Sequence, residues 1–87
     1  MELLKEVGFV RRGKNRRIVF ESLGSPAMPS ELVVKIYRKR SNTCFNLVSR
    51  ALRELKERGL VEVVNPDDKT GRIYRRTKRG EKVVVIL

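Results

Sequence analysis

Residues 46–64 read NLVSRALRELKERGLVEVV, and the spacing of their apolar residues is the clearest structural signal in the chain. At about 100° per residue, one side of a helix through this stretch would carry Phe45, Val48, Ala51, Leu52 and Leu55. The opposite side would carry Thr43, Asn46, Arg50, Arg53 and Glu57. The pattern predicts an amphipathic helix over about residues 43–58, with Asn42 or Thr43 as its N-cap and Gly59 ending it in a left-handed conformation.

A β-hairpin is predicted to follow this helix. The segments LVEVV (60–64) and RIYRR (72–76) alternate apolar and polar residues in short β-branched runs, as half-buried strands do. Between them, NPDDKTG (65–71) has the composition of a turn, so Asp67 and Asp68 are expected to form that turn and not a metal site. We expect a hairpin over about residues 60–77, with Lys69 at its tip and a returning strand made basic at exposed positions by Arg72, Arg75 and Arg76.

Two shorter helices are predicted in the first half of the chain. KNRRIVFESL predicts a helix over about residues 14–23, which glycines bound on both sides. The following GSPAMPS (24–30) is expected to be a turn, because its two prolines disfavour a helix before Ser30. Ser30 would then cap a helix over about residues 30–38, with Leu32, Val33 and Ile36 facing inward, and the basic RKRSNT (38–43) would form the next turn.

Length and charge limit what this chain can do. Its 87 residues predict one small domain over residues 1–87, with little room for a substrate cleft. Lysine and arginine number 21 against 10 acidic residues, for a net charge of +11, which indicates an anionic partner such as nucleic acid or a membrane surface. The longest apolar run, VVVIL (83–87), is far shorter than the ~20 residues of a spanning helix. We therefore expect no membrane partner.

The residue types that support catalysis or metal binding are scarce. The chain has no histidine, which argues against a hydrolytic triad or a metal site, so neither an enzyme nor a cofactor is expected. Cys44 is the single cysteine, lies on the apolar side of its predicted helix, and is expected to be a packed thiol. A lone cysteine fits a reducing compartment, and MELLKEVGFV (1–10) lacks the apolar core of a signal peptide. These features predict a cytoplasmic protein.

The order of these segments resembles a known family. A helix, a helix starting with PSEL, a helix containing SRALRELKERGLVE and the run NPDDKTGRIYRRTKRGEKV together resemble the winged helix-turn-helix DNA-binding domains of microbial transcription regulators. The chain is most similar to small archaeal forms related to the MarR and ArsR groups, over roughly residues 8–84. The resemblance implies an α+β fold with a three-helix core, a β-hairpin wing and a short C-terminal helix within TKRGEKVVVIL (77–87). It further implies that residues 43–58 form the recognition helix and residues 65–72 the wing tip.

Double-stranded DNA is the partner that this resemblance implies. A helix fits the major groove, where arginine can bond guanine and asparagine can bond adenine, each in a bidentate manner. The candidates for base readout are Asn42, Thr43, Asn46, Ser49 and Arg50. The candidates for the phosphate backbone, which supplies salt-sensitive affinity and register, are Arg16, Arg17, Lys39, Arg40, Arg53, Lys69, Thr70, Arg72, Arg75 and Arg76.

Other interpretations remain open from the sequence. Arg50 and Arg53 could be solvated arginines that pair with Glu54 and Glu57 along the helix. The domain could bind RNA or DNA through charge alone, or dock onto another protein, because a fold does not determine a function. We also expect a homodimer through MELLKEVGFV (1–10) or VVVIL (83–87), since both segments offer apolar residues to spare.

Overall fold

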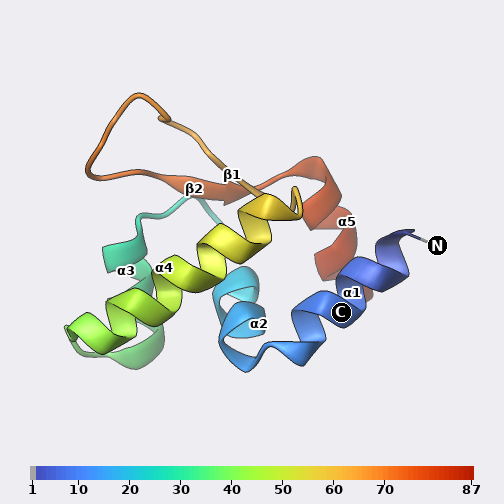
Figure 1. Cartoon of the computed structure of the whole chain (residues 1–87), viewed down its shortest axis with the longest axis horizontal. Coiled ribbons are helices and arrows are strands. Elements are labelled where there is room, and N and C mark those ends of the chain that lie inside the picture. The colour runs from blue at the N-terminus through green and yellow to red at the C-terminus, as the bar shows by residue number, and fades with distance from the viewer. Residues whose placement is uncertain (1) are drawn as a thin grey trace.

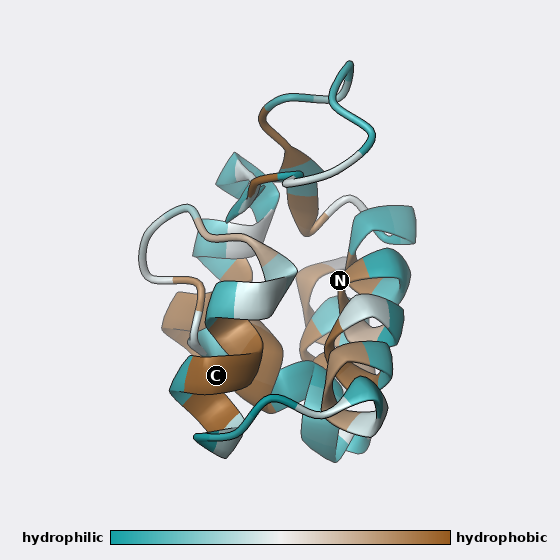
Figure 2. Ribbon diagram, turned by 90° about the vertical axis from the view of Figure 1, so that its left-hand side faces the viewer, coloured by the Kyte–Doolittle hydropathy of each residue, from teal (hydrophilic) through white to brown (hydrophobic). Residues whose placement is uncertain are grey.

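The computed structural model describes residues 2–87, which form five helices and one two-stranded antiparallel sheet. The elements are α1 (Glu2–Arg12), α2 (Lys14–Glu21), α3 (Pro29–Tyr37), α4 (Asn42–Glu57), β1 (Val61–Val63), β2 (Tyr74–Arg76) and α5 (Lys78–Ile86). Helix α4 crosses the middle of the molecule, and both α2 and α3 pack against it (Figure 1). The loop between β1 and β2 projects away from the helices (Figure 1 and Figure 2). The expected α+β class is therefore confirmed.

Helix α4 occupies the predicted stretch, shifted by one residue at each end. Its N-cap is Ser41, and not Asn42 or Thr43, because the Ser41 hydroxyl accepts a hydrogen bond from the Cys44 N–H. Gly59 has the predicted left-handed conformation, with φ at 74°. The buried residues of the helix are Cys44, Val48, Ala51, Leu52 and Leu55.

Phe45 was expected on the buried side of α4, and that prediction is wrong. Its side chain is 44% exposed. Periodicity places Phe45 at nearly the same angle as Leu52, but an angle does not say what lies opposite it. Toward the N-terminal end of α4 the opposing space is a hollow bounded by the start of α3 and the tip of the hairpin, and Phe45 lines that hollow.

Helix α3 starts at Pro29, so the prediction of Ser30 as its N-cap is wrong. A proline is favourable at the first helical position, where its fixed φ suits the helix and its missing N–H would have no partner. The Met28 N–H donates instead to the Glu31 carboxylate at 2.7 Å, which closes this end of the helix. Leu32 and Val33 are buried as expected, and Ile36 is half-buried against the core.

The hairpin forms where predicted, but its regular strands are only three residues long. Val61 pairs with Arg76, Glu62 with Arg75, and Val63 with Tyr74. Ala27, in the segment before α3, exchanges two further backbone hydrogen bonds with Tyr74, at 3.0 and 2.8 Å. This bridge joins the start of α3 to the hairpin, so the hairpin is held beside α3 and α4.

Two helices lie outside the predicted three-helix core. Helix α1 was not predicted; a buried carboxylate, Glu6, interrupts the apolar spacing of Val7 and Val10 on its inner side. Helix α5 was expected from the resemblance and is present, with the Thr77 hydroxyl accepting from the Gly80 N–H at 3.0 Å. Helices α1 and α5 pack against each other.

This contact uses part of the apolar surface that was expected at a dimer interface. Val7, Val10 and Val83 are buried, whereas Leu4 and Val85 are 61% and 84% exposed. Met1 lies outside the described residues, and the homodimer stays a prediction. None of the helices within residues 2–87 combines the length and the apolar composition that crossing a membrane requires.

Candidate nucleic-acid interface

The outer side of α4 presents most of the residues predicted to read bases. Asn42, Thr43 and Asn46 are exposed, and Ser49 is half-buried. Arg50 is exposed as well, with 72% of its side-chain surface open to solvent. Since Ser41 caps the helix just before Asn42, the cap stabilises the first turn that carries these polar side chains.

The tip of the hairpin is organised by one side chain, Asn65. Its Oδ1 accepts from the Ile73 N–H at 2.7 Å, while its Nδ2 donates to Asp68 Oδ2 at 2.7 Å and to the Gly71 carbonyl at 3.1 Å. Gly71 has a φ of 67°, a conformation that favours glycine. Arg72 Nε donates to the Asp68 carbonyl at 2.9 Å, so this loop also orients an arginine.

These contacts agree with the expectation that the aspartates form a turn. Asp68 contributes both its side chain and its backbone to the loop. Within residues 2–87, no group of three or more histidine, cysteine, aspartate or glutamate side chains could hold a metal ion.

A basic hollow lies between the outer side of α4 and the hairpin. Its lining residues are Asn46, Ser49, Arg50, Arg53, Lys56, Arg72 and Tyr74. Four of them are cations and none is an acid, so the hollow suits an anionic ligand. Lys56 was missed by the sequence analysis, although it lies one helical turn beyond Arg53 and could have been found from that spacing.

Other predicted residues adjoin this hollow. A second, more apolar hollow shares Ser49, Arg72 and Tyr74 with the basic one, and it is also lined by Met28, Pro29, Ser30, Phe45, Lys69, Thr70 and Gly71. Arg40 and Asn42 line a third, next to Ser30 and Phe45. Lys39 and Thr43 are exposed and line none of these hollows. The structure thus gathers most of the predicted set along one continuous surface.

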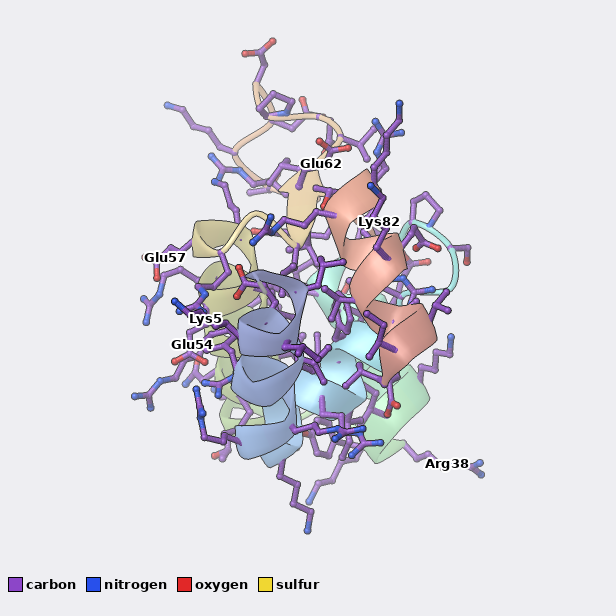
Figure 3. The ribbon with its side chains drawn as sticks, turned by 90° about the vertical axis from the view of Figure 1, so that its right-hand side faces the viewer. Lys5, Arg38, Glu54, Glu57, Glu62 and Lys82 are labelled. Atoms are coloured by element: carbon purple, nitrogen blue, oxygen red, sulfur yellow. The ribbon has the colours of Figure 1, made fainter. Side chains whose placement is uncertain are left out.

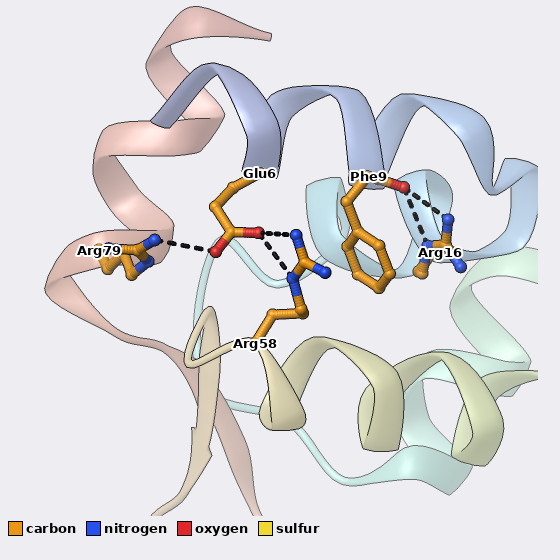
Figure 4. A network of polar contacts seen from close by, with 5 residues as sticks. All are labelled: Glu6, Phe9, Arg16, Arg58 and Arg79. Carbon is orange, nitrogen blue, oxygen red and sulfur yellow. Dashed lines mark hydrogen bonds and ion pairs between the residues drawn. The ribbon is translucent and has the colours of Figure 1, made fainter. Parts of the chain in front are cut away.

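Arg16 is not available as predicted, because its guanidinium is engaged inside the fold. Its Nε and Nη2 donate to the Phe9 carbonyl, and the guanidinium stacks 3.9 Å from the centre of the Phe9 ring (Figure 4). Its Nη1 contacts Glu54 at 3.3 Å, and only 17% of the side chain is exposed. Arg16 therefore joins α1, α2 and α4. Arg17, in contrast, is partly exposed and pairs with Glu21 along α2.

The prediction that Arg76 is an exposed position of the returning strand is wrong. Its side chain is 10% exposed, donates to Glu81 at 2.7 Å and to the Phe20 carbonyl at 3.0 Å, and so packs the hairpin onto α2 and α5. Arg75 is exposed and pairs with Glu62 across the sheet at 2.7 Å. Because side chains alternate along a strand, Arg75 lies on the opposite face from Tyr74, which lines the hollow.

Arg50 has the pairing that the alternative interpretation expected, but the pair is loose. Arg50 Nε lies 3.8 Å from Glu54 Oε2, beyond hydrogen-bonding distance, while the other oxygen of Glu54 faces Arg16. Exposed pairs of this kind contribute only about 0–1 kcal/mol. Arg50 can therefore leave Glu54 at little cost. For Arg53, no ion pair with Glu57 occurs in the described part of the chain.

A buried carboxylate on α1 holds the C-terminal end of α4 in place. Glu6 accepts from Arg58 Nε and from Arg79 Nη2, both at 2.8 Å (Figure 4). Burial raises the pKa of Glu6, but the hydrogen bonds and charges of the two arginines outweigh it and keep the pKa below its ordinary value of 4.5. The Arg58 guanidinium also stacks 4.4 Å from the centre of the Phe9 ring. This cluster connects α1, the end of α4 and α5.

Two further side chains help to anchor α4 and the helices around it. Cys44 is 5% exposed, which confirms the expected packed thiol. The Tyr37 hydroxyl donates to Asn15 Oδ1 at 3.0 Å and links α3 to α2, and burial raises the pKa of Tyr37. Both residues serve packing.

No protein-family model matches this chain, and no match is found among curated proteins or solved structures. The function proposed below therefore rests on the residues and the geometry described above.

Proposed function

We propose that this chain is a winged helix-turn-helix domain that binds double-stranded DNA as a transcription regulator. Helices α2, α3 and α4 would be its three-helix core, α4 its recognition helix, and the hairpin β1–β2 its wing. The order of these elements and the projection of the hairpin beside α4 support this assignment (Figure 1). In this arrangement α4 enters the major groove and the wing follows the neighbouring backbone.

The observation that carries the proposal is the basic hollow between α4 and the hairpin. Arg50, Arg53, Lys56 and Arg72 line it together, although Arg72 comes from the far side of the loop between the strands. A rigid double helix needs cations on one continuous surface, and not merely a high net charge. The Asn65 hydrogen bonds in the wing tip and the Ser41 cap at the start of α4 constrain the backbone on both sides of this surface.

The residues of the surface separate into two roles. Asn46 and Arg50 project from α4 with polar groups suited to adenine and guanine, and each well-aligned bidentate contact discriminates by about 1–3 kcal/mol. Asn42, Thr43 and Ser49 stand beside them on the helix. The cations at the edges of the surface would contact phosphates: Arg40, Arg53, Lys56, Lys69 and Arg72.

The count of phosphate contacts predicts the salt dependence of binding. Each neutralised phosphate of B-form DNA lowers the slope of log K against log salt by about 0.9, so these five side chains predict a slope of about −4 to −5. A protein that binds anions through its whole surface would show no such link between the slope and particular side chains.

The experiment begins by enriching a random duplex pool on the purified protein. Fluorescence anisotropy across a salt series then compares the enriched duplex with random duplex and single-stranded RNA. Arg50→Ala should lower the discrimination at one base pair by about five- to 150-fold, because it removes a base contact. Lys82→Ala is the matched control, since Lys82 projects from α5 on the side of the molecule formed by the terminal helices (Figure 3).

The outcomes separate the candidate functions. A duplex preference that persists at physiological salt and decreases in Arg50→Ala would support site-reading by α4. Equal, weak binding to every polyanion, unchanged by Arg50→Ala, would refute the proposal in favour of binding through charge alone. Half-sites related by two-fold symmetry and about 10 base pairs apart would further support the expected homodimer.

A further inference from the structure

Phe45 is an aromatic residue whose position the core does not explain. It is 44% exposed, whereas Cys44 and Val48 on the same helix are 5% and 0% exposed. Its neighbours on the surface of α4 are Asn42 and Ser49, three residues before it and four after, so Phe45 borders the side chains proposed to read bases. Because other apolar side chains line the same hollow, this exposed phenylalanine offers a contact for an apolar group on the ligand.

The hollow beside Phe45 is lined by both apolar and polar side chains. Met28, Pro29 and Tyr74 line it together with Phe45. Its polar lining comes from Lys69 and Arg72 of the wing and from Ser30 and Ser49 of α3 and α4. The two cations favour a polyanion, while the apolar side chains favour a small apolar group carried by that polyanion.

In duplex DNA one group meets both requirements. Thymine carries a C5 methyl group in the major groove, and apolar side chains, phenylalanine among them, contact it. We propose that Phe45 reads a thymine by packing against this methyl group, with Met28 and Pro29 as the neighbouring wall. This inference rests on the proposed function, since it requires α4 to lie in the major groove.

The expected effect follows from the burial of one methyl group. Burying a group of that size from water strengthens binding about fourfold. Replacing the thymine by deoxyuridine removes only the methyl group and leaves the base pair intact. The affinity for the enriched duplex should therefore fall about fourfold at the position that Phe45 contacts, and not at positions outside its reach.

The test replaces each thymine of the enriched duplex by deoxyuridine, one at a time, and measures Kd for the wild type and for variants. In Phe45→Ala, thymine and deoxyuridine should bind equally well at the sensitive position, while Phe45→Leu should keep part of the difference. Ile86→Ala is the control, because Ile86 is similarly exposed, at 43%, but lies at the end of α5. Circular dichroism checks that each variant is folded.

The replacement is made in the DNA, so the wild type alone can refute the inference. An enriched duplex with no thymine, or one in which no single replacement weakens binding, overturns the role of Phe45 and leaves the proposed function standing. A sensitive thymine that responds equally in Phe45→Ala overturns it as well. If no duplex is enriched at all, both the proposed function and this inference fall.

Discussion

Replacing Gly80 by alanine, which adds one Cβ atom, should show how tightly α5 packs against the end of α4. It is buried in the first turn of α5, next to the chain that connects α4 to β1. A Cβ at this position would come closer than 3.0 Å to the Leu60 carbonyl oxygen and within 3.1 Å of the Leu60 carbonyl carbon. Both atoms belong to the backbone, so no side-chain rotation can relieve the overlap.

The cost of Gly80→Ala can be worked out from these contacts. Overpacking costs about 1–3 kcal/mol, and we expect the upper half of that range because backbone must move. The Leu60 carbonyl also accepts from the Thr77 N–H at 3.0 Å, a hydrogen bond worth about 0.5–1.5 kcal/mol that the shift would weaken. The better helix propensity of alanine offsets about 1 kcal/mol of this loss in the free energy of unfolding. The net loss is about 2–3 kcal/mol, which lowers Tm by about 10–20 °C in a domain of this size.

Gly8→Ala provides the matched control for helix propensity. A Cβ on Gly8, in the middle of α1, would meet only Arg12 Nη1 at 3.6 Å, which is an ordinary contact. This variant should gain about 0.5–1 kcal/mol. Urea and thermal unfolding, followed by circular dichroism, measure both variants. If Gly80→Ala proved as stable as Gly8→Ala, the close packing of α5 against Leu60 would be refuted.

Two further pairs of variants each have a matched control. One pair compares a buried ion pair with an exposed one, and the other compares an arginine inside the proposed interface with one outside it. Glu6→Gln should lower the free energy of unfolding by about 1–3 kcal/mol at pH 7, less than the about 3–5 kcal/mol of a fully buried pair, because Arg58 and Arg79 keep some contact with water. Since the pKa of Glu6 is lowered in the folded state, its contribution is present above pH 4.5 and is lost as the pH falls through the lowered pKa, so the two unfolding curves should converge in acid. Glu62→Gln breaks only an exposed pair and should cost less than about 1 kcal/mol; an equal loss in both variants would contradict the role of Glu6. In DNA binding, Arg72→Ala should weaken affinity for all duplexes alike and reduce the salt slope by about 1, whereas Arg75→Ala, on the other face of the hairpin, should leave the slope unchanged. A salt titration that shows the same change in both variants would remove the wing tip from the interface.

The helices and the hairpin that form the proposed interface could be predicted because their signals are local. Apolar spacing located α4, and Gly59 marked its end. NPDDKTG located the loop between the strands, where the Asn65 amide donates to the Gly71 carbonyl and the Asp68 N–H donates to the Asn65 carbonyl, all within a few residues. Each of these features depends on residues that are close to one another in the sequence, so the sequence alone reveals it.

The residues that cap the helices were predicted less accurately than the helices themselves, because the choice of cap is not purely local. Ser41 and Met28 became the N-caps in place of Asn42 or Thr43 and of Ser30. At α4, Ser41, Asn42 and Thr43 are all of a type that caps helices well, whereas at α3 the N-cap position goes to Met28 because Pro29 takes the first helical position. The choice between them depends on how the incoming chain is held, and Ala27 is held by its bridge to Tyr74, far along the sequence.

Which basic residues face outward was decided by tertiary contacts alone. Arg16 and Arg50 look alike in the sequence, yet Arg16 is committed to the Phe9 carbonyl and to Glu54, whereas Arg50 remains open to solvent. Arg76 bonds the carbonyl of Phe20, 56 residues away, and so leaves the exposed set. Net charge and periodicity follow from composition and order, but the availability of a guanidinium depends on acceptors that only folding brings near it.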